Sequence, residues 1–136
     1  MIKGIDHIGI VVQNIESVAV RLSDLYGVEK PEIKFAEDRN IKVAVVRFGG
    51  TSLELLEDFN ETLTLPHLDG KAHGKVLENF IHHYALGCTD IDNDITELEK
   101  KGCVRIGDGP VVGLRGKRIQ FIHDQATDLL VELSDA

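Results

Sequence analysis

Two histidines and two glutamates recur at matching places in this chain of 136 residues, and all four are of types that bind metal ions. His7 and Glu54 lie 47 residues apart, and His83 and Glu132 lie 49 residues apart. Imidazole nitrogens and carboxylate oxygens together suit a divalent transition metal and leave coordination positions for water or substrate. The four residues therefore predict one divalent metal site, for which cobalt, nickel, manganese and zinc are all candidate ions.

Each of these residues also has a simpler explanation. A single histidine on a strand is more often a hydrogen-bonded core or surface residue, and a glutamate on an edge strand is usually solvated. Glu54 and Glu132, however, each interrupt an otherwise apolar strand, where a buried carboxylate needs a compensating partner. The recurrence of both residue types favours the metal interpretation. His82 points to the opposite face from His83 by strand alternation, so we expect it to be structural or on the surface.

The elements that must position these residues occur twice along the chain. In the first half, Ile5–Val12 alternates in polarity and predicts a strand with His7 on the face opposite Ile8. A helix follows, with Asn14 as its N-cap and Gly27 as its stop. Three further strands are predicted at about 30–36, 41–48 and 51–57.

The second half repeats this order. A strand at 81–86 is followed by a helix that Asp90 caps and Gly102 ends, and then by strands near 103–107, 117–123 and 128–134. Four identities relate the halves at an offset of 76, namely Ile5, His7, Ile15 and Leu22 with Ile81, His83, Ile91 and Leu98. The repeat predicts a tandem duplication and an α+β fold of two βαβββ modules within a single domain, residues 1–136. The modules span about 1–58 and 81–136, and a linker of about 59–80 holds His67 and His73, which have no repeat partner and are not expected to bind metal.

Composition bounds the function further. The chain is 43% hydrophobic and 28% charged with a formal net charge of −8, which argues against nucleic acid and anionic membranes as partners. No apolar run approaches the roughly 18 residues of a membrane span. Cys88 and Cys103 cannot form a disulfide framework, so we expect a reducing, cytoplasmic location.

Several segments resemble the vicinal oxygen chelate superfamily, which includes glyoxalases, bleomycin resistance proteins and dioxygenases, and are most similar to methylmalonyl-CoA epimerases. The segments are 5–10 (IDHIGI), 52–57 (SLELLE), 82–87 (HHYALG), 116–123 (GKRIQFIH) and 130–133 (LVEL). The resemblance implies a cupped, partly open eight-stranded sheet around a metal site. It also implies His7, Glu54, His83 and Glu132 as the ligands.

The resemblance further implies a metal-dependent epimerase of a 2-substituted acyl-CoA such as methylmalonyl-CoA. Such an enzyme abstracts the α-proton and forms a metal-stabilised enolate. Glu132 is the first candidate for the catalytic base, and Glu54 is its counterpart for the opposite face of the substrate. The alternatives are a lactoylglutathione lyase of the glyoxalase I type, with a glutathione conjugate as substrate, and a non-catalytic small-molecule-binding protein. Extradiol dioxygenases of this superfamily are larger, which makes that activity the less favoured one.

An acidic protein that binds an acidic thioester needs a local positive patch. Residues 115–118 carry three cations, and Arg115 and Lys117 are the predicted contacts for the coenzyme A phosphates. Gly113 and Gly116 would allow the backbone to approach a phosphate closely. Lys117 and Arg118 are expected to point to opposite faces once the strand begins, so not all three cations contribute. We expect a homodimer.

Overall fold

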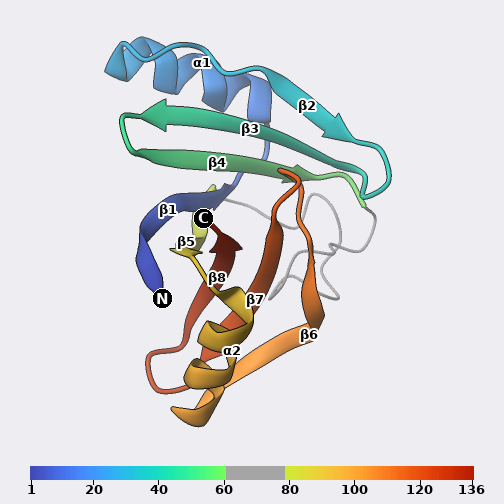
Figure 1. The fold of residues 1–136 in the computed structure, drawn as a ribbon. Coiled ribbons are helices and arrows are strands. Elements are labelled where there is room, and N and C mark those ends of the chain that lie inside the picture. Colours follow the sequence, from blue (N-terminus) through green and yellow to red (C-terminus); the bar gives the residue numbers. More distant parts are fainter. Residues whose placement is uncertain (61–78) are drawn as a thin grey trace. The chain divides into compact units, whose positions relative to one another are not determined.

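The computed structural model describes residues 1–60 and 79–136, and its elements follow the predicted order twice (Figure 1). The first module contains β1 (Ile2–Val11), α1 (Ile15–Tyr26), β2 (Ile33–Ala36), β3 (Ile41–Phe48) and β4 (Thr51–Asp58). The second contains β5 (Phe80–Cys88), α2 (Ile91–Lys100), β6 (Cys103–Val112), β7 (Arg118–Asp124) and β8 (Leu129–Asp135). The prediction of an α+β fold with two βαβββ modules is confirmed.

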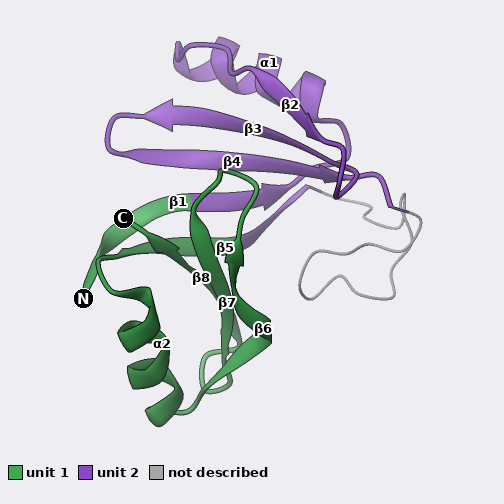
Figure 2. Ribbon diagram, turned by 45° about the vertical axis from the view of Figure 1, so that its right-hand side comes forward, with its two compact units in different colours: residues 1–7, 83–136 green, residues 8–82 purple. Residues whose placement is uncertain are grey.

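The strands are hydrogen-bonded in the order β2-β3-β4-β1-β5-β8-β7-β6, which makes one open, mixed sheet of eight strands. The chain divides into two compact units, of which unit 1 is Met1–His7 with His83–Ala136 and unit 2 is Ile8–His82 (Figure 2). The division falls inside β1 and β5, so the units differ in their bounds from the two modules. The single domain over residues 1–136 stays a prediction.

In unit 2, α1 begins and ends where the sequence predicts. The side chain of Asn14 accepts the Ser17 N–H at 2.9 Å, and Gly27 ends the helix in the left-handed region with φ 66°. A residue without a side chain adopts that conformation at little cost. The helix packs an apolar stripe against the β-strands of this unit, and the buried core there comprises Val12, Ile15, Ala19, Ala44, Val46 and Leu55.

Strand alternation in unit 2 separates two glutamates of β4. Glu57 Oε1 accepts the N–H of Ile15 at 2.8 Å, at the start of α1, and Leu55 lies in the core under the same helix. Side chains an odd number of residues apart on a strand lie on opposite faces. Glu54, which pairs with Val45 of β3, therefore lies on the face of the strand that is turned away from α1.

In unit 1, α2 begins at the predicted cap, since the side chain of Asp90 accepts the Asn93 N–H at 3.2 Å. The helix covers a buried core that comprises Cys88, Ile91, Ile95, Ile122, Val131 and Leu133. Glu132 lies between Val131 and Leu133 on β8 and faces away from this core, as Glu54 does on β4. The two modules thus place a glutamate at equivalent positions, each on the helix-free face of its last strand.

Strand boundaries differ from the predictions at several places. β1 begins at Ile2 rather than at Ile5. β2 begins at Ile33 rather than at about residue 30. β6 runs to Val112, well past the predicted end near residue 107, because its pairing with β7 shifts register between Ile106 and Val111 and then resumes. The residues at the shift, 107–110 (GDGP), have the composition of a turn, which is why alternation alone ends the strand too early.

Three smaller predictions concern the remaining histidines, the cysteines and membrane helices. His67 and His73 lie outside the described residues. Cys88 is buried, as expected, and both cysteines are free. No helix in the described part of the chain is long and apolar enough to cross a membrane.

Candidate metal centre

Unit 1 brings together three of the four predicted metal ligands. His7 on β1, His83 on β5 and Glu132 on β8 come from consecutive strands of the sheet, and each is at most 5% exposed. The two Nε2 atoms are 3.4 Å apart, and Glu132 places one carboxylate oxygen 3.7 Å from His7 Nε2 and the other 3.2 Å from His83 Nε2. The three side chains therefore direct their metal-binding atoms to one point.

These distances fit a divalent ion. Nitrogen and oxygen ligands bound to one ion at about 2.0–2.2 Å lie roughly 3 to 3.6 Å from one another in tetrahedral or octahedral geometry. Two of the three separations, 3.4 and 3.2 Å, are of this size and the third, 3.7 Å, is slightly longer, and the donors are two imidazoles and a carboxylate rather than thiolates. His7, His83 and Glu132 could therefore hold a divalent metal ion.

Burial changes the proton affinity of the carboxylate. Removal from water raises the pKa of Glu132 to about 7, although the nearby His7 and Arg115 act in the opposite direction. A carboxylate with a pKa near neutrality takes up and gives up a proton easily under physiological conditions. Glu132 can therefore serve either as a ligand or as a proton carrier.

His83 is held neutral and fixed in orientation. Burial lowers its pKa to about 4, so the imidazole keeps a lone pair for a metal ion at neutral pH. The ring of Phe121 packs edge to face against it, with centroids 5.1 Å apart and planes at 90°. Phe121 pairs with Glu132 across β7 and β8, so a single aromatic ring borders two of the three candidate ligands.

Asp6 and Arg115 also belong to this cluster, although the sequence predicted neither of them to contact a metal ligand. Asp6 Oδ2 lies 2.7 Å from His7 Nδ1 and 3.3 Å from Arg115 Nη1. Burial raises the pKa of Asp6, but the hydrogen bond and charge of His7 and the charges of Arg115 and Lys117 outweigh it, and the pKa is lowered overall. The sequence could have pointed to Asp6, because this acidic residue directly precedes His7. Instead, only Arg115 was singled out from the sequence, as a contact for the coenzyme A phosphates.

The other predicted site residues lie as follows. Glu54 is buried on β4 in unit 2, and its role as the fourth ligand stays a prediction. Lys117 is exposed, and the role of Arg115 and Lys117 in phosphate binding is likewise untested. Arg118 forms an ion pair with Asp92 at 2.9 Å, and His82 is buried with its ring 6.4 Å from that of Phe80.

A repeated βαβββ module with a histidine on its first strand and a glutamate on its last defines a class of proteins that build a metal site on a β-sheet. The chain belongs to the Glyoxalase/Bleomycin resistance protein/Dioxygenase superfamily, whose model matches residues 6–121. The resemblance seen in the sequence motifs is thereby confirmed.

Two relatives and one solved structure show which members of this superfamily the chain is similar to. The chain is 27% identical to the ethylmalonyl-CoA/methylmalonyl-CoA epimerase of Cereibacter sphaeroides over 98% of either chain. It is 29% identical to the uncharacterized protein YqjC of Bacillus subtilis, with 96% of this chain and 91% of that one covered. A variant of the Streptomyces coelicolor methylmalonyl-CoA epimerase, solved in complex with 2-nitronate-propionyl-CoA, matches at 27% identity with a TM-score of 0.81 over 100% of this chain and 99% of that chain.

Proposed function

We propose that this protein epimerises a 2-substituted acyl-CoA of the methylmalonyl-CoA type. The observation that carries the proposal is Glu132, a buried carboxylate with a pKa of about 7 beside two imidazoles. Epimerisation requires a group that removes a proton next to the thioester carbonyl and returns a proton on the other face. A carboxylate of this proton affinity suits that task.

A divalent ion fits the residues present. We assign His7, His83 and Glu132 as its ligands together with Glu54, which has the same place on β4 as Glu132 on β8 and the same helix-free face. When bound, the ion would supply positive charge to the substrate oxygens as a Lewis acid. The imidazoles would contribute two nitrogen donors, and among residues 1–60 and 79–136 the candidate metal-binding group contains no other histidine.

Proton transfer falls to the carboxylates. In this proposal Glu132 removes the α-proton, since its carboxylate is buried beside both imidazoles at the centre of the candidate site and can accept a proton and return it. Glu54, buried and unable to be solvated freely, serves the opposite face. Glu132 is only 5% exposed and pairs with Phe121 across β7 and β8, so an apolar residue lies next to the carboxylate on the same face of the sheet.

Recognition of the thioester rests on charge. The chain carries a net charge of −8, so an anionic coenzyme A thioester must be met by local cations, and Arg115 and Lys117 are our candidates. Lys117 is exposed, and Arg115 is partly exposed while its guanidinium contacts Asp6, so an incoming phosphate could approach both cations from the solvent side. The homodimer and the cytoplasmic location stay predictions.

The test is a proton-exchange assay in deuterated water. With metal-loaded protein, we expect deuterium to enter the α-position of methylmalonyl-CoA at a catalysed rate. Glu97→Gln, an exposed change on α2, is the control and should leave the rate unchanged, while Glu132→Gln should abolish it. Turnover of a glutathione hemithioacetal without exchange into methylmalonyl-CoA would instead establish a lyase of the glyoxalase I type. Ligand binding without either reaction would identify a binding protein.

A further inference from the structure

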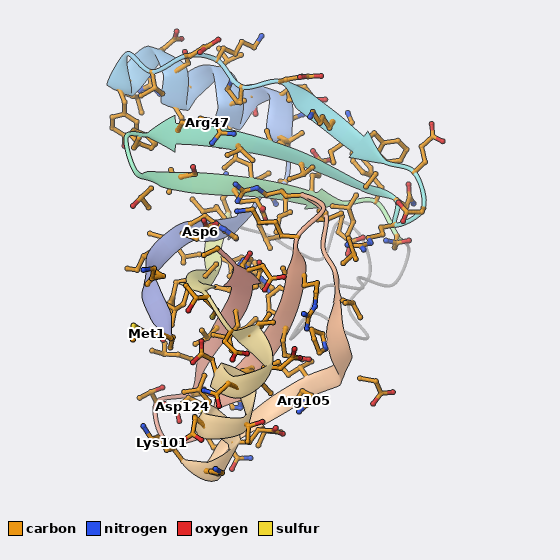
Figure 3. All side chains as sticks on the ribbon, in the orientation of Figure 1. Met1, Asp6, Arg47, Lys101, Arg105 and Asp124 are labelled. Atoms are coloured by element: carbon orange, nitrogen blue, oxygen red, sulfur yellow. The ribbon has the colours of Figure 1, made fainter. Side chains whose placement is uncertain are left out.

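Asp6 has no part in the ligand set, yet it makes a short polar contact with one of the candidate ligands. Its Oδ2 atom lies 2.7 Å from His7 Nδ1, the ring nitrogen that does not face Glu132. Asp6 lies on β1 next to His7 in sequence (Figure 3). His7 is only 1% exposed, so the protonation of its two ring nitrogens is decided by these neighbours rather than by water.

The contacts of Nδ1 determine where the proton of a neutral His7 lies. Arg115 Nη1 is 3.1 Å from Nδ1 and Asp6 Oδ2 is 2.7 Å from it, so a donor and an acceptor both approach the same atom. A bare Nδ1 would place its lone pair against a carboxylate oxygen at 2.7 Å, which is repulsive. A protonated Nδ1 donates to Asp6, and Arg115 can then donate to the same carboxylate at 3.3 Å.

We propose that Asp6 and Arg115 are positioning residues that hold His7 as the Nδ1–H tautomer, with its Nε2 lone pair directed toward His83 and Glu132. The consequence for metal affinity rests on the function proposed above, whereas the tautomer does not. Carboxylates that accept the second ring N–H of a ligating histidine fix the ring and raise the basicity of the ligand, and their removal commonly costs 10- to 100-fold in affinity.

Arg115 acts on His7 through Asp6. Its guanidinium is about one-quarter exposed and lies against a carboxylate that is exposed to a similar degree. By holding that carboxylate in place and ionised, Arg115 keeps the acceptor aligned with the ring. This contact links the loop before β7 to β1 within unit 1, and it gives Arg115 a task that does not require coenzyme A.

The tautomer is measured directly by long-range ¹H–¹⁵N NMR of the imidazoles in metal-free protein, with the His7 signals assigned by their loss in His7→Gln. We expect the Nδ1–H form in the wild type and in Asp6→Asn, whose amide oxygen still accepts. Asp6→Ala should shift His7 toward the Nε2–H form. Asp128→Asn removes an exposed carboxylate that lies 2.8 Å from the partly exposed His123 and is the matched control. An Nε2–H form of His7 in the wild type would overturn the proposal.

Metal affinity is measured separately by titration of each variant with Co²⁺, followed by visible absorption. We expect 10- to 100-fold weaker binding for Asp6→Ala, a smaller loss for Asp6→Asn and a loss of several-fold for Arg115→Met. Arg118→Met, three residues further along at the start of β7 and paired with Asp92, should bind like the wild type.

The outcomes separate the two proposals. If the wild type shows the Asp6-dependent tautomer but does not bind Co²⁺, the metal-dependent function fails and the positioning role of Asp6 stands. If Asp6→Ala keeps both the tautomer and the affinity, the positioning role fails while the function stands. If Arg115→Met changes neither the metal affinity nor the tautomer of His7, Arg115 is not a positioning residue. If that variant only raises KM for an acyl-CoA, Arg115 contacts the substrate instead. Circular dichroism shows whether each variant is folded. If Asp6→Ala does not fold, the metal affinity of Asp6→Asn provides the test instead.

Discussion

In the proposed function Glu132 is both a metal ligand and the base that removes the α-proton, and a single substitution separates these roles. Glu132→Gln keeps an oxygen that can bind an ion but cannot accept the α-proton. We expect the exchange rate to fall by about 100-fold or more, whereas metal content falls much less. Stopped-time deuterium incorporation and elemental analysis of the same sample measure the two effects. Exchange near the wild-type rate with metal retained would exclude Glu132 as the base and make Glu54 the leading candidate.

The same carboxylate makes the stability of the metal-free protein depend on pH. Burial raises the pKa of Glu132 from 4.5 to about 7, so its stabilising contribution is complete below about pH 4.5 and is lost as the pH rises through 7. His83 acts in the other direction, because its pKa is lowered to about 4 and its destabilising contribution disappears by about pH 6.5. The free energy of unfolding of Glu132→Gln relative to wild type should therefore increase by on the order of 2 kcal/mol between pH 5 and 8. Urea denaturation with a chelator present measures it, and a difference that does not vary with pH would contradict the raised pKa.

Two adjacent histidines provide a matched comparison on β5. His83 turns its Nε2 toward His7 and Glu132, whereas His82 is buried beside Phe80. We expect His83→Ala to lose most of the bound metal, because His7 is then the one imidazole left in the candidate group within the described part of the chain, while folded His82→Ala retains it. Elemental analysis after dialysis against a defined metal buffer decides the matter. Full metal content in His83→Ala would remove His83 from the ligand set.

At the scale of single elements, Glu57 shows that the two buried glutamates of β4 have different tasks. Its carboxylate accepts the N–H of Ile15, a fully buried residue at the positive end of α1. Glu57→Ala should lower the free energy of unfolding by about 1–3 kcal/mol, because a buried donor loses its acceptor. Denaturant titration measures the loss, and metal content should stay unchanged. A loss of metal instead of stability would mean that Glu57, rather than Glu54, belongs to the site.

The elements differ in how much of them could be predicted from sequence. The starts of both helices could be predicted from Asn14 and Asp90, because an N-cap side chain accepts an N–H only three residues further along the chain. β6 is predicted too short because its register shift depends on pairing with β7, which no local pattern contains. The candidate ligands His7, His83 and Glu132 were predicted from the recurrence of histidine and glutamate in the two halves, and the structure brings these three side chains together. Asp6 was not predicted, since its role depends on a 2.7 Å contact with the ring of His7 that spacing does not reveal.

At the scale of the whole molecule, net charge and local charge act against each other. A chain with a net charge of −8 repels an anionic thioester, while Lys117, near Asp6 and exposed, attracts it. We expect Lys117→Ala to raise KM for an acyl-CoA two- to fivefold at low ionic strength and to have little effect at high salt, where such interactions are screened. Steady-state kinetics at two salt concentrations measure it. Lys101→Ala, at the far end of α2 (Figure 3), is the control, and an equal effect on a phosphate-free thioester would contradict a role in phosphate binding.

The candidate ligands come from neighbouring strands that are distant in sequence. His7 and His83 are 76 residues apart, His83 and Glu132 are 49 apart, and β5 pairs with β8 in parallel so that Ala85 lies opposite Glu132. Contacts of such long range form late in folding, since the entropy of closing the intervening loops must be overcome first. A slip of one residue in β8 would turn Glu132 toward α2 and Leu133 toward the imidazoles. If His7, His83 and Glu132 bind one ion together, that ion would stabilise only chains whose strands have paired in the correct register, and metal binding would then favour the native pairing over slipped ones.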